Sequence, residues 1–187
     1  LVQEGDAHRE AVWQRELTRR LQALSGIELF ATLDENERHK MAEHLVHAPF
    51  AKGGVITRQG AVAHWLYIIV SGEADVFWEA PGGERRLLAH LPQGSIFGEM
   101  GLMTGAPRAS TVVASTDCEC YRLDKNGFEE IIRARPELAE SMSHTLALRL
   151  QQIDELKDEY RKERSDSEKA AHRAALVQRI RDFFGLK

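Results

Sequence analysis

The sequence predicts an α+β protein, mainly β, in which an antiparallel β-roll or jelly roll is flanked by N-terminal and C-terminal helices. Two observations predict this fold class. In residues 47–123, short segments rich in β-branched and aromatic residues alternate with glycine-containing turns, a pattern typical of an all-β barrel or double sheet. On both sides of this region, apolar residues recur at helical spacing among many charges, which indicates amphipathic helices.

The bulk composition is that of a globular protein of ordinary size. The chain has 187 residues, of which 43% are hydrophobic and 29% charged, and this is enough to bury a core. The formal net charge is −4. Because binding to duplex nucleic acid depends largely on Lys and Arg that neutralise phosphates, no nucleic-acid partner is expected. No apolar run approaches the roughly 20 residues of a membrane-spanning helix.

The first region, 1–46, is expected to consist of helices that act as a connector. Apolar residues follow helical spacing from Ala7 to Ser25. Asp34 is predicted to cap a second helix that runs to about Val46, because Glu37 three residues later completes a capping-box-like pattern. Two roles stay open for the first helix, which either packs on its own domain or connects it to an upstream module.

The second region, 47–123, is expected to form the β-roll. Turns containing glycine or proline separate its strands, since these residues favour sharp changes of chain direction. The predicted strands are Ala48–Ala51, Val55–Arg58, Trp65–Ser71, Ala74–Glu79, Arg85–Leu91, Ser95–Phe97, Ser110–Ser115 and Glu119–Leu123.

Helices are expected again in 124–157. Asp124 is predicted to cap a helix that runs through Arg133, and the residue before Pro136 is predicted to break it, because that position disfavours helical backbone. A longer helix with one apolar stripe follows. The simplest interpretation of this stripe is packing against the roll.

The last region, 158–187, is predicted to be a charged spacer followed by an amphipathic terminal helix. From Lys157 to Lys169 opposite charges stand about four residues apart, which favours either an exposed helix or a soluble spacer. Three uses stay open for the terminal helix. It packs on the domain, pairs with a copy of itself in a homo-oligomer, or lies on a membrane surface.

The segment Phe97–Thr111 interrupts the strand series and combines groups that suit an anion. Glu99 can accept a hydrogen bond from a hydroxyl group, and Arg108 offers a planar fork of donors that matches a phosphate. The backbone amides at the start of a short helical turn add further donors. A helical turn between two strands would place these groups at the mouth of the roll, with apolar residues behind them to receive a flat base. The residues nominated as base contacts are Val70, Leu87, Leu88 and Val112.

Two runs in this segment, Phe97-Gly98-Glu99 and Pro107-Arg108-Ala109-Ser110-Thr111, resemble the phosphate-binding cassette of the cyclic nucleotide-binding domain family. Arg58-Gln59-Gly60 and Tyr67-Ile68-Ile69-Val70-Ser71-Gly72 are also typical of that family's β-roll. The resemblance covers about residues 29–150.

The resemblance implies a role for each cassette residue. Glu99 is expected to bind the ribose 2′-hydroxyl group and Arg108 the cyclic phosphate, with backbone contacts to the phosphate from Gly98, Ala109 and Ser110. In this family the final helix moves over the pocket when nucleotide binds. Arg149 stands where a side chain of that helix would cover the base, and a guanidinium can stack on a purine.

The residue after the cassette arginine bears on the choice of nucleotide. In the resembling family a threonine there commonly helps to hold the guanine of cGMP, and an alanine is typical of domains that prefer cAMP. This chain has Ala109. We therefore expect cAMP as the ligand, without excluding cGMP, and no cofactor or metal.

Several effectors stay open for such a sensor. The chain begins without Met or a signal-like stretch, and we expect it to be a cytoplasmic piece of a longer protein. The main expectation is a bacterial cyclic nucleotide-regulated or mechanosensitive-type channel upstream in the same chain. The alternatives are a catabolite-activator-type transcription regulator, a stand-alone cAMP receptor and a kinase regulatory domain.

An enzyme is not expected, since no nucleophile with its base and no metal signature is found. Cys118 and Cys120 are too close in the chain to bridge without strain and are expected to be reduced thiols, as in a cytosolic protein.

Overall fold

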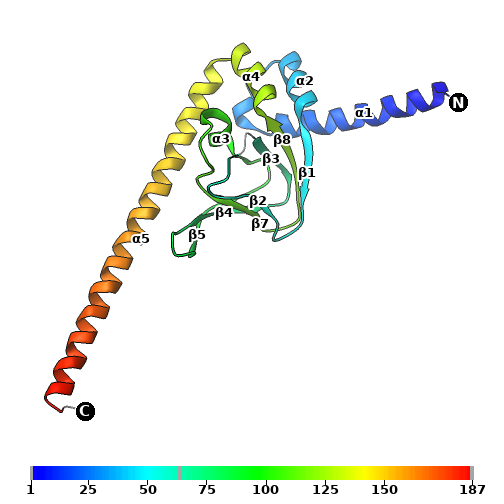
Figure 1. Ribbon diagram of the computed structural model, residues 1–187. Coiled ribbons are helices and arrows are strands. Elements are labelled where there is room, and N and C mark those ends of the chain that lie inside the picture. The colour runs from blue at the N-terminus through cyan, green and yellow to red at the C-terminus, as the bar shows by residue number, and fades with distance from the viewer. Residues whose placement is uncertain (1, 63–64, 186–187) are drawn as a thin grey trace. The chain divides into compact units, whose positions relative to one another are not determined.

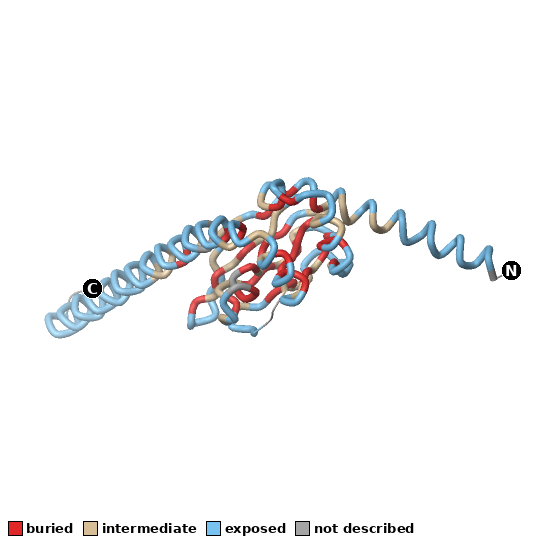
Figure 2. Tube along the Cα trace, turned by 90° about the horizontal axis from the view of Figure 1, so that it is seen from above, coloured by how far each residue is buried: buried red, intermediate tan, exposed pale blue. Residues whose placement is uncertain are grey.

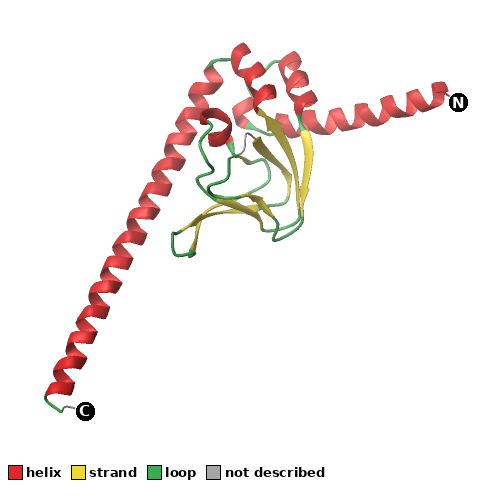
Figure 3. Ribbon diagram, in the orientation of Figure 1, coloured by secondary structure: helices red, strands yellow, loops and turns green. Residues whose placement is uncertain are grey.

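The computed structural model describes residues 2–62 and 65–185 and confirms the predicted α+β class (Figures 1 and 3). The chain divides into two compact units, Leu1–Leu148 and Arg149–Lys187. Helices precede and follow the strands. They are α1 (Val2–Ser25), the short 3-10 helix η1 (Glu28–Phe30), α2 (Glu35–His44), α4 (Lys125–Ala134) and α5 (Glu137–Phe183).

The strands form two antiparallel four-stranded sheets. All eight predicted strands are present, and their ends differ from the predicted ones by at most two residues. Sheet A has the order β1 (Val46–Phe50), β8 (Cys118–Asp124), β3 (Trp65–Ser71), β6 (Ile96–Phe97). Sheet B has the order β2 (Val55–Thr57), β7 (Thr111–Ala114), β4 (Ala74–Glu79), β5 (Arg85–Leu91).

Sheet A separates two hydrophobic clusters. Side chains alternate between the faces of a strand, so Tyr67 and Ile69 of β3 join the cluster inside the roll, and Leu66 and Ile68 join the cluster beneath the helices. Figure 2 shows that the buried residues gather in the roll and in the helices that adjoin it. The roll therefore has an interior of its own. The cassette helix α3 (Glu99–Thr104) follows β6, and its residue Leu102 belongs to the cluster beneath the helices.

Both predicted helix caps are confirmed. The Asp34 carboxylate accepts a hydrogen bond of 2.8 Å from the amide of Glu37 at the start of α2. The Asp124 carboxylate accepts one of the same length from the amide of Gly127 at the start of α4. Each cap satisfies an amide that the helix itself leaves unpaired.

Two helix ends differ from the prediction. α2 ends at His44, because Leu45 has extended backbone and Val46 already pairs in β1. α5 continues through the expected spacer to Phe183, since no glycine or proline interrupts residues 137–183 and pairs such as Arg164–Glu168 link successive turns. Residues 186 and 187 of the predicted terminal helix lie outside the described residues.

The second half of α1 packs within the first unit and contributes to the cluster beneath the helices. Leu24 is completely buried, whereas Val12 and Trp13 remain 49% and 39% exposed. The hydroxyl of Tyr121 on β8 donates a 2.9 Å hydrogen bond to the carboxylate of Glu16. This half of the helix therefore packs on its own domain, and the role of the N-terminal helices as a connector stays a prediction. Among the described residues, no helix is long and apolar enough to cross a membrane.

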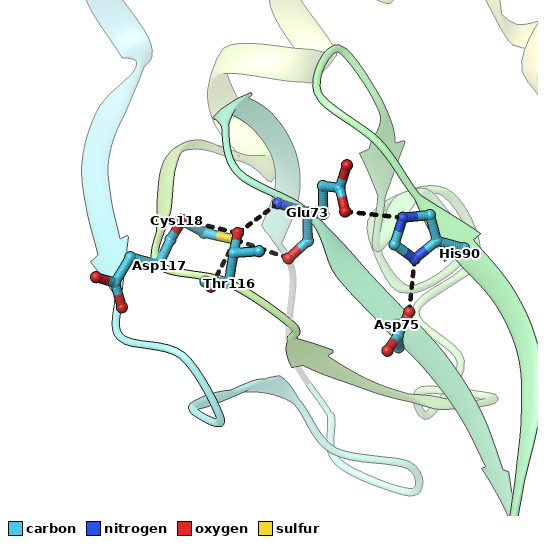
Figure 4. Close-up of polar contacts among 6 residues, drawn as sticks. All are labelled: Glu73, Asp75, His90, Thr116, Asp117 and Cys118. Carbon is cyan, nitrogen blue, oxygen red and sulfur yellow. Dashed lines mark hydrogen bonds and ion pairs between the residues drawn. The ribbon is translucent and has the colours of Figure 1, made fainter.

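A polar cluster joins β4, β5 and the turn before β8 (Figure 4). His90 lies between two carboxylates, 2.7 Å from Asp75 through Nδ1 and 3.1 Å from Glu73 through Nε2. The backbone of Glu73 accepts a hydrogen bond from the thiol of Cys118 and its amide donates one to the hydroxyl of Thr116. The hydrogen bond with Asp75, aided by Glu73, raises the pKa of His90 above its ordinary value of 6.5.

This cluster predicts a pH-dependent stability. Because the folded state raises the pKa of His90, its stabilising effect is complete below pH 6.5 and is lost as the pH rises through the raised pKa. We expect the thermal midpoint of the wild type to exceed that of His90→Gln most at about pH 6 and least at about pH 9. His8→Gln, on the exposed face of α1, serves as the control. A difference that stays constant over this range would contradict the prediction.

Candidate functional site

The cassette is built on a glycine that no other residue could replace without strain. Gly98 precedes α3 with φ +83°, a left-handed conformation that side chains disfavour. A Cβ atom at this position would lie 2.5 Å from Nη1 of Arg108 and 2.7 Å from the carbonyl oxygen of Trp65. The missing side chain is therefore what allows the arginine to lie directly against the start of the helix.

Two backbone carbonyls hold the side chain of Arg108. Nη1 donates a 2.6 Å hydrogen bond to the carbonyl oxygen of Gly98, and Nη2 donates a 2.8 Å hydrogen bond to that of Trp65. The residue is only 5% exposed, and its Nε has no hydrogen-bond partner among the described residues. A guanidinium has five N–H donors. Arg108 is thus fixed in place and keeps donors for a further acceptor.

The backbone of Arg108 is held from its other side by the turn after β2. The amide of Gly60 donates to the carbonyl oxygen of Arg108 at 2.7 Å, and the amide of Arg108 donates to the carbonyl oxygen of Ala61 at 2.8 Å. The amide of Gln59 donates to the hydroxyl of the completely buried Thr111 at 3.0 Å. These contacts give a structural reason for the Arg58-Gln59-Gly60 run noted in the sequence.

The site contains two buried groups of opposite charge. Glu99 is 2% exposed, at the first position of α3. Burial lowers the pKa of Arg108, while Tyr67 and the Glu99 carboxylate oppose this shift. Burying a charge costs free energy unless partners compensate for it. An anion bound at Arg108 would provide such compensation, and the arrangement is suited to holding an anion.

Two backbone amides next to Arg108 are also available. The amides of Ala109 and Ser110 have no hydrogen-bond partner among the described residues, and both residues are half-buried. The structure thus brings Glu99, Arg108 and these amides together within the cassette. For Gly98 it shows a contact through the carbonyl, whereas the expected contact of its amide with a phosphate stays a prediction.

The predicted base contacts are not brought together as one set. Val112 is buried in the cluster inside the roll, and Leu88 packs against that cluster. Leu87 is 59% exposed, and Val70 packs against the cluster beneath the helices, on the opposite face of sheet A. Arg149 belongs to the second compact unit, and its contact with a base stays a prediction.

Sequence reasoning missed the contributions of two aromatic positions. Trp65 holds Arg108 through its backbone carbonyl, a contact that leaves no signal in residue type. Tyr67 stacks on Phe97, with ring centroids 5.2 Å apart and planes 7° apart, and so fixes the strand that leads into the cassette. The Tyr67–Phe97 pair could have been found only from the register of β3 and β6.

Glu99 also lines a cavity of about 580 Å³ on the side of the first part of α5. Leu29 and Thr32 contribute from η1 and the turn after it, and Leu138 and Met142 contribute from α5. The glutamate therefore connects the cassette with the helices that flank the roll.

The described residues contain no cluster of His, Cys, Asp or Glu that could hold a metal ion. Cys118 and Cys120 are free, as expected, and both are buried. Burial raises the pKa of Cys120 to about 12, so its thiol stays protonated at neutral pH and is a poor nucleophile.

Comparison with a family model and with curated proteins finds similarity to proteins whose descriptions name a cyclic nucleotide. Residues 48–135 match the family described as the cyclic nucleotide-binding domain. The cAMP-dependent protein kinase regulatory subunit of Blastocladiella emersonii is 35% identical over 109 residues, which are 58% of this chain and 27% of that protein. The cyclic AMP receptor protein of Thermus thermophilus is 31% identical over 131 residues, which are 70% of this chain and 61% of that protein.

Solved structures agree with this relationship. The crystal structure of the Thermus thermophilus catabolite activator protein matches with a TM-score of 0.61 and 32% identity, covering 70% of this chain and 61% of that chain. A cAMP-bound structure of PfPKA-R matches with a TM-score of 0.58 and 27% identity, covering 63% of this chain and 42% of that chain. The chain spans less than two thirds of each of these proteins.

These relatives are regulatory subunits and receptors, which confirms the expectation of a non-catalytic domain. The matched segment contains the cassette, Arg108 and the turn that holds its backbone. Residues 48–135 are therefore similar to the cyclic nucleotide-binding domain family over the part of the chain that contains the site.

Proposed function

We propose that the chain is the sensor part of a regulatory protein and that it binds cAMP between Glu99 and Arg108. The observation that carries this proposal is the buried guanidinium of Arg108, which two carbonyls fix while Nε remains without a partner. In the proposed complex Arg108 donates to the cyclic phosphate, together with the amides of Ala109 and Ser110. Glu99 accepts a hydrogen bond from the ribose 2′-hydroxyl group.

The choice of cAMP over cGMP rests on Ala109 and on the relatives. Alanine has no hydroxyl group with which to hold the guanine. The two curated relatives described above are named a cAMP-dependent protein kinase regulatory subunit and a cyclic AMP receptor protein, and the PfPKA-R structure contains cAMP. We propose the purine site inside the roll, against Val112 and Leu88.

For the attached effector, we favour a regulator of the kinase-subunit or catabolite-activator type, or a stand-alone cAMP receptor. The relatives described above belong to these classes. The channel hypothesis has no support from any of them. The described residues after α4 form the single helix α5 and no helix-turn-helix, so we assign to this chain the sensor role and not DNA binding.

We propose that ligand binding is signalled through α5. The cavity of about 580 Å³ lies between Glu99 and the side chains of Leu138 and Met142. A change in the position of Glu99 on binding ribose would alter the wall of this cavity and so bias the position of the helix. The size of such a shift is limited by the difference in cAMP affinity between the two positions.

The first prediction of the proposed function concerns affinity. Arg108→Ala is expected to weaken cAMP binding by about 2 to 4 kcal/mol, because a charge-assisted contact with the phosphate is lost. Arg108→Lys is expected to fall between this variant and the wild type, since lysine keeps the charge but not the planar fork. Titration calorimetry measures both. Arg133→Ala on the surface of α4, where the side chain is 78% exposed, is the control, and unchanged affinity of Arg108→Ala would refute the site.

The second prediction concerns signalling. Saturating cAMP is expected to change hydrogen exchange in the first two turns of α5, because Leu138 and Met142 in these turns line the cavity beside Glu99. Arg108→Ala at the same cAMP concentration is expected to exchange like the ligand-free wild type. If saturated wild-type protein exchanged at the same rates as ligand-free protein throughout α5, the proposed signal would have to follow another path.

A further inference from the structure

We propose that Arg122 is a positioning residue for Arg108 and that it acts through Trp65. This inference rests on the proposed function, because it concerns how tightly the same site holds a cyclic phosphate. None of the sequence motifs includes Arg122, and its role follows from the contacts between neighbouring strands.

Arg122 faces the interior of the roll. It follows Cys118 and Cys120 in alternation along β8, and both cysteines belong to the cluster inside the roll. In the register between the strands, Arg122 is opposite Tyr67 of β3 and therefore diagonal to Trp65. Its guanidinium carbon lies 4.3 Å from the centroid of the Trp65 ring, which is the distance of a close cation–π contact.

Trp65 connects this contact with the phosphate-binding arginine. Its ring stacks with Arg122, and its carbonyl oxygen accepts the 2.8 Å hydrogen bond from Nη2 of Arg108. Trp65 is the first residue of β3, where the ladder of the sheet begins. An anchored ring restricts the backbone of the same residue, so Arg122 helps to fix the direction in which this carbonyl points.

The ring is the main compensation for the charge of Arg122. The side chain is half-buried, and no carboxylate pairs with it among the described residues. Its Nε is buried without a hydrogen-bond partner. A guanidinium can stack flat on an indole, whereas a lysine ammonium is a point charge and requires stronger hydration. The pair is thus specific for arginine and an aromatic ring.

Loss of the contact between Arg122 and Trp65 is expected to weaken the binding of ligands that carry a phosphate, and of no others. If the Trp65 carbonyl is less well fixed, Arg108 adopts its binding geometry less often, and preorganisation contributes to affinity. A ligand without a phosphate does not use Arg108 and should not sense this change. Adenosine has the same base and the same 2′-hydroxyl group as cAMP and lacks the phosphate, so it separates the two effects.

The experiment compares the dissociation constants of cAMP and adenosine for the whole chain. Arg122→Met approximates the length of the side chain and removes the charge. We expect it to raise the dissociation constant for cAMP roughly fivefold, which corresponds to the loss of one cation–π contact that is partly exposed to solvent. The constant for adenosine should stay unchanged. Arg122→Lys should show a smaller loss for cAMP, and it carries the test if Arg122→Met fails to fold by its thermal midpoint.

The control is a second arginine stacked on an aromatic ring, away from the cassette. The guanidinium carbon of Arg85 on β5 lies 5.2 Å from the centroid of the Phe77 ring on β4. Arg85→Met should change neither constant. The inference is overturned if Arg122→Met and Arg122→Lys bind cAMP like the wild type, or if they weaken adenosine as much as cAMP. Wild-type protein that binds adenosine and not cAMP would instead overturn the proposed function, and this inference with it.

Discussion

The site depends on the burial of one guanidinium between two backbone carbonyls. Arg108 contacts Gly98 at the start of α3 and Trp65 at the start of β3, and the turn at Gly60 and Ala61 pairs with its backbone. Three other segments therefore meet at one residue, two at its side chain and one at its backbone. Because the carbonyls are neutral acceptors, they orient the cation without neutralising it. The charge stays available for an anion, and Nε stays available to donate to it.

The fold creates the conditions for this arrangement. Sheet A gives the roll its own apolar interior, and the Tyr67–Phe97 stack fixes the strands that lead into the cassette. Glycine at position 98 provides the space in which arginine and helix meet. In a buried setting the interaction between a phosphate and a guanidinium is stronger than in water, because the effective dielectric constant is lower. A small anionic ligand can therefore bind tightly to few groups.

Much of the fold and of the candidate site could be predicted from the sequence, and there are physical reasons why the remaining features could not. The strands and caps follow from local patterns, such as the glycine turns and Asp34 before Glu37. Glu99 and Arg108 were identified from a resemblance to known motifs. The contact of Arg108 with the Trp65 carbonyl involves backbone atoms, which no residue type reveals. Val70 was assigned to the pocket because strand alternation in β3 did not indicate which of its faces meets the helices.

The most direct measurement is a crystal structure of the chain grown with cAMP. We expect a cyclic phosphate within hydrogen-bond distance of Arg108 and of the amides at Ala109 and Ser110, with the ribose 2′-hydroxyl group at Glu99. We also expect the Trp65 carbonyl to keep its hydrogen bond from Arg108. A nucleotide bound elsewhere on the roll, or an Arg108 side chain turned away from the phosphate, would contradict this binding mode.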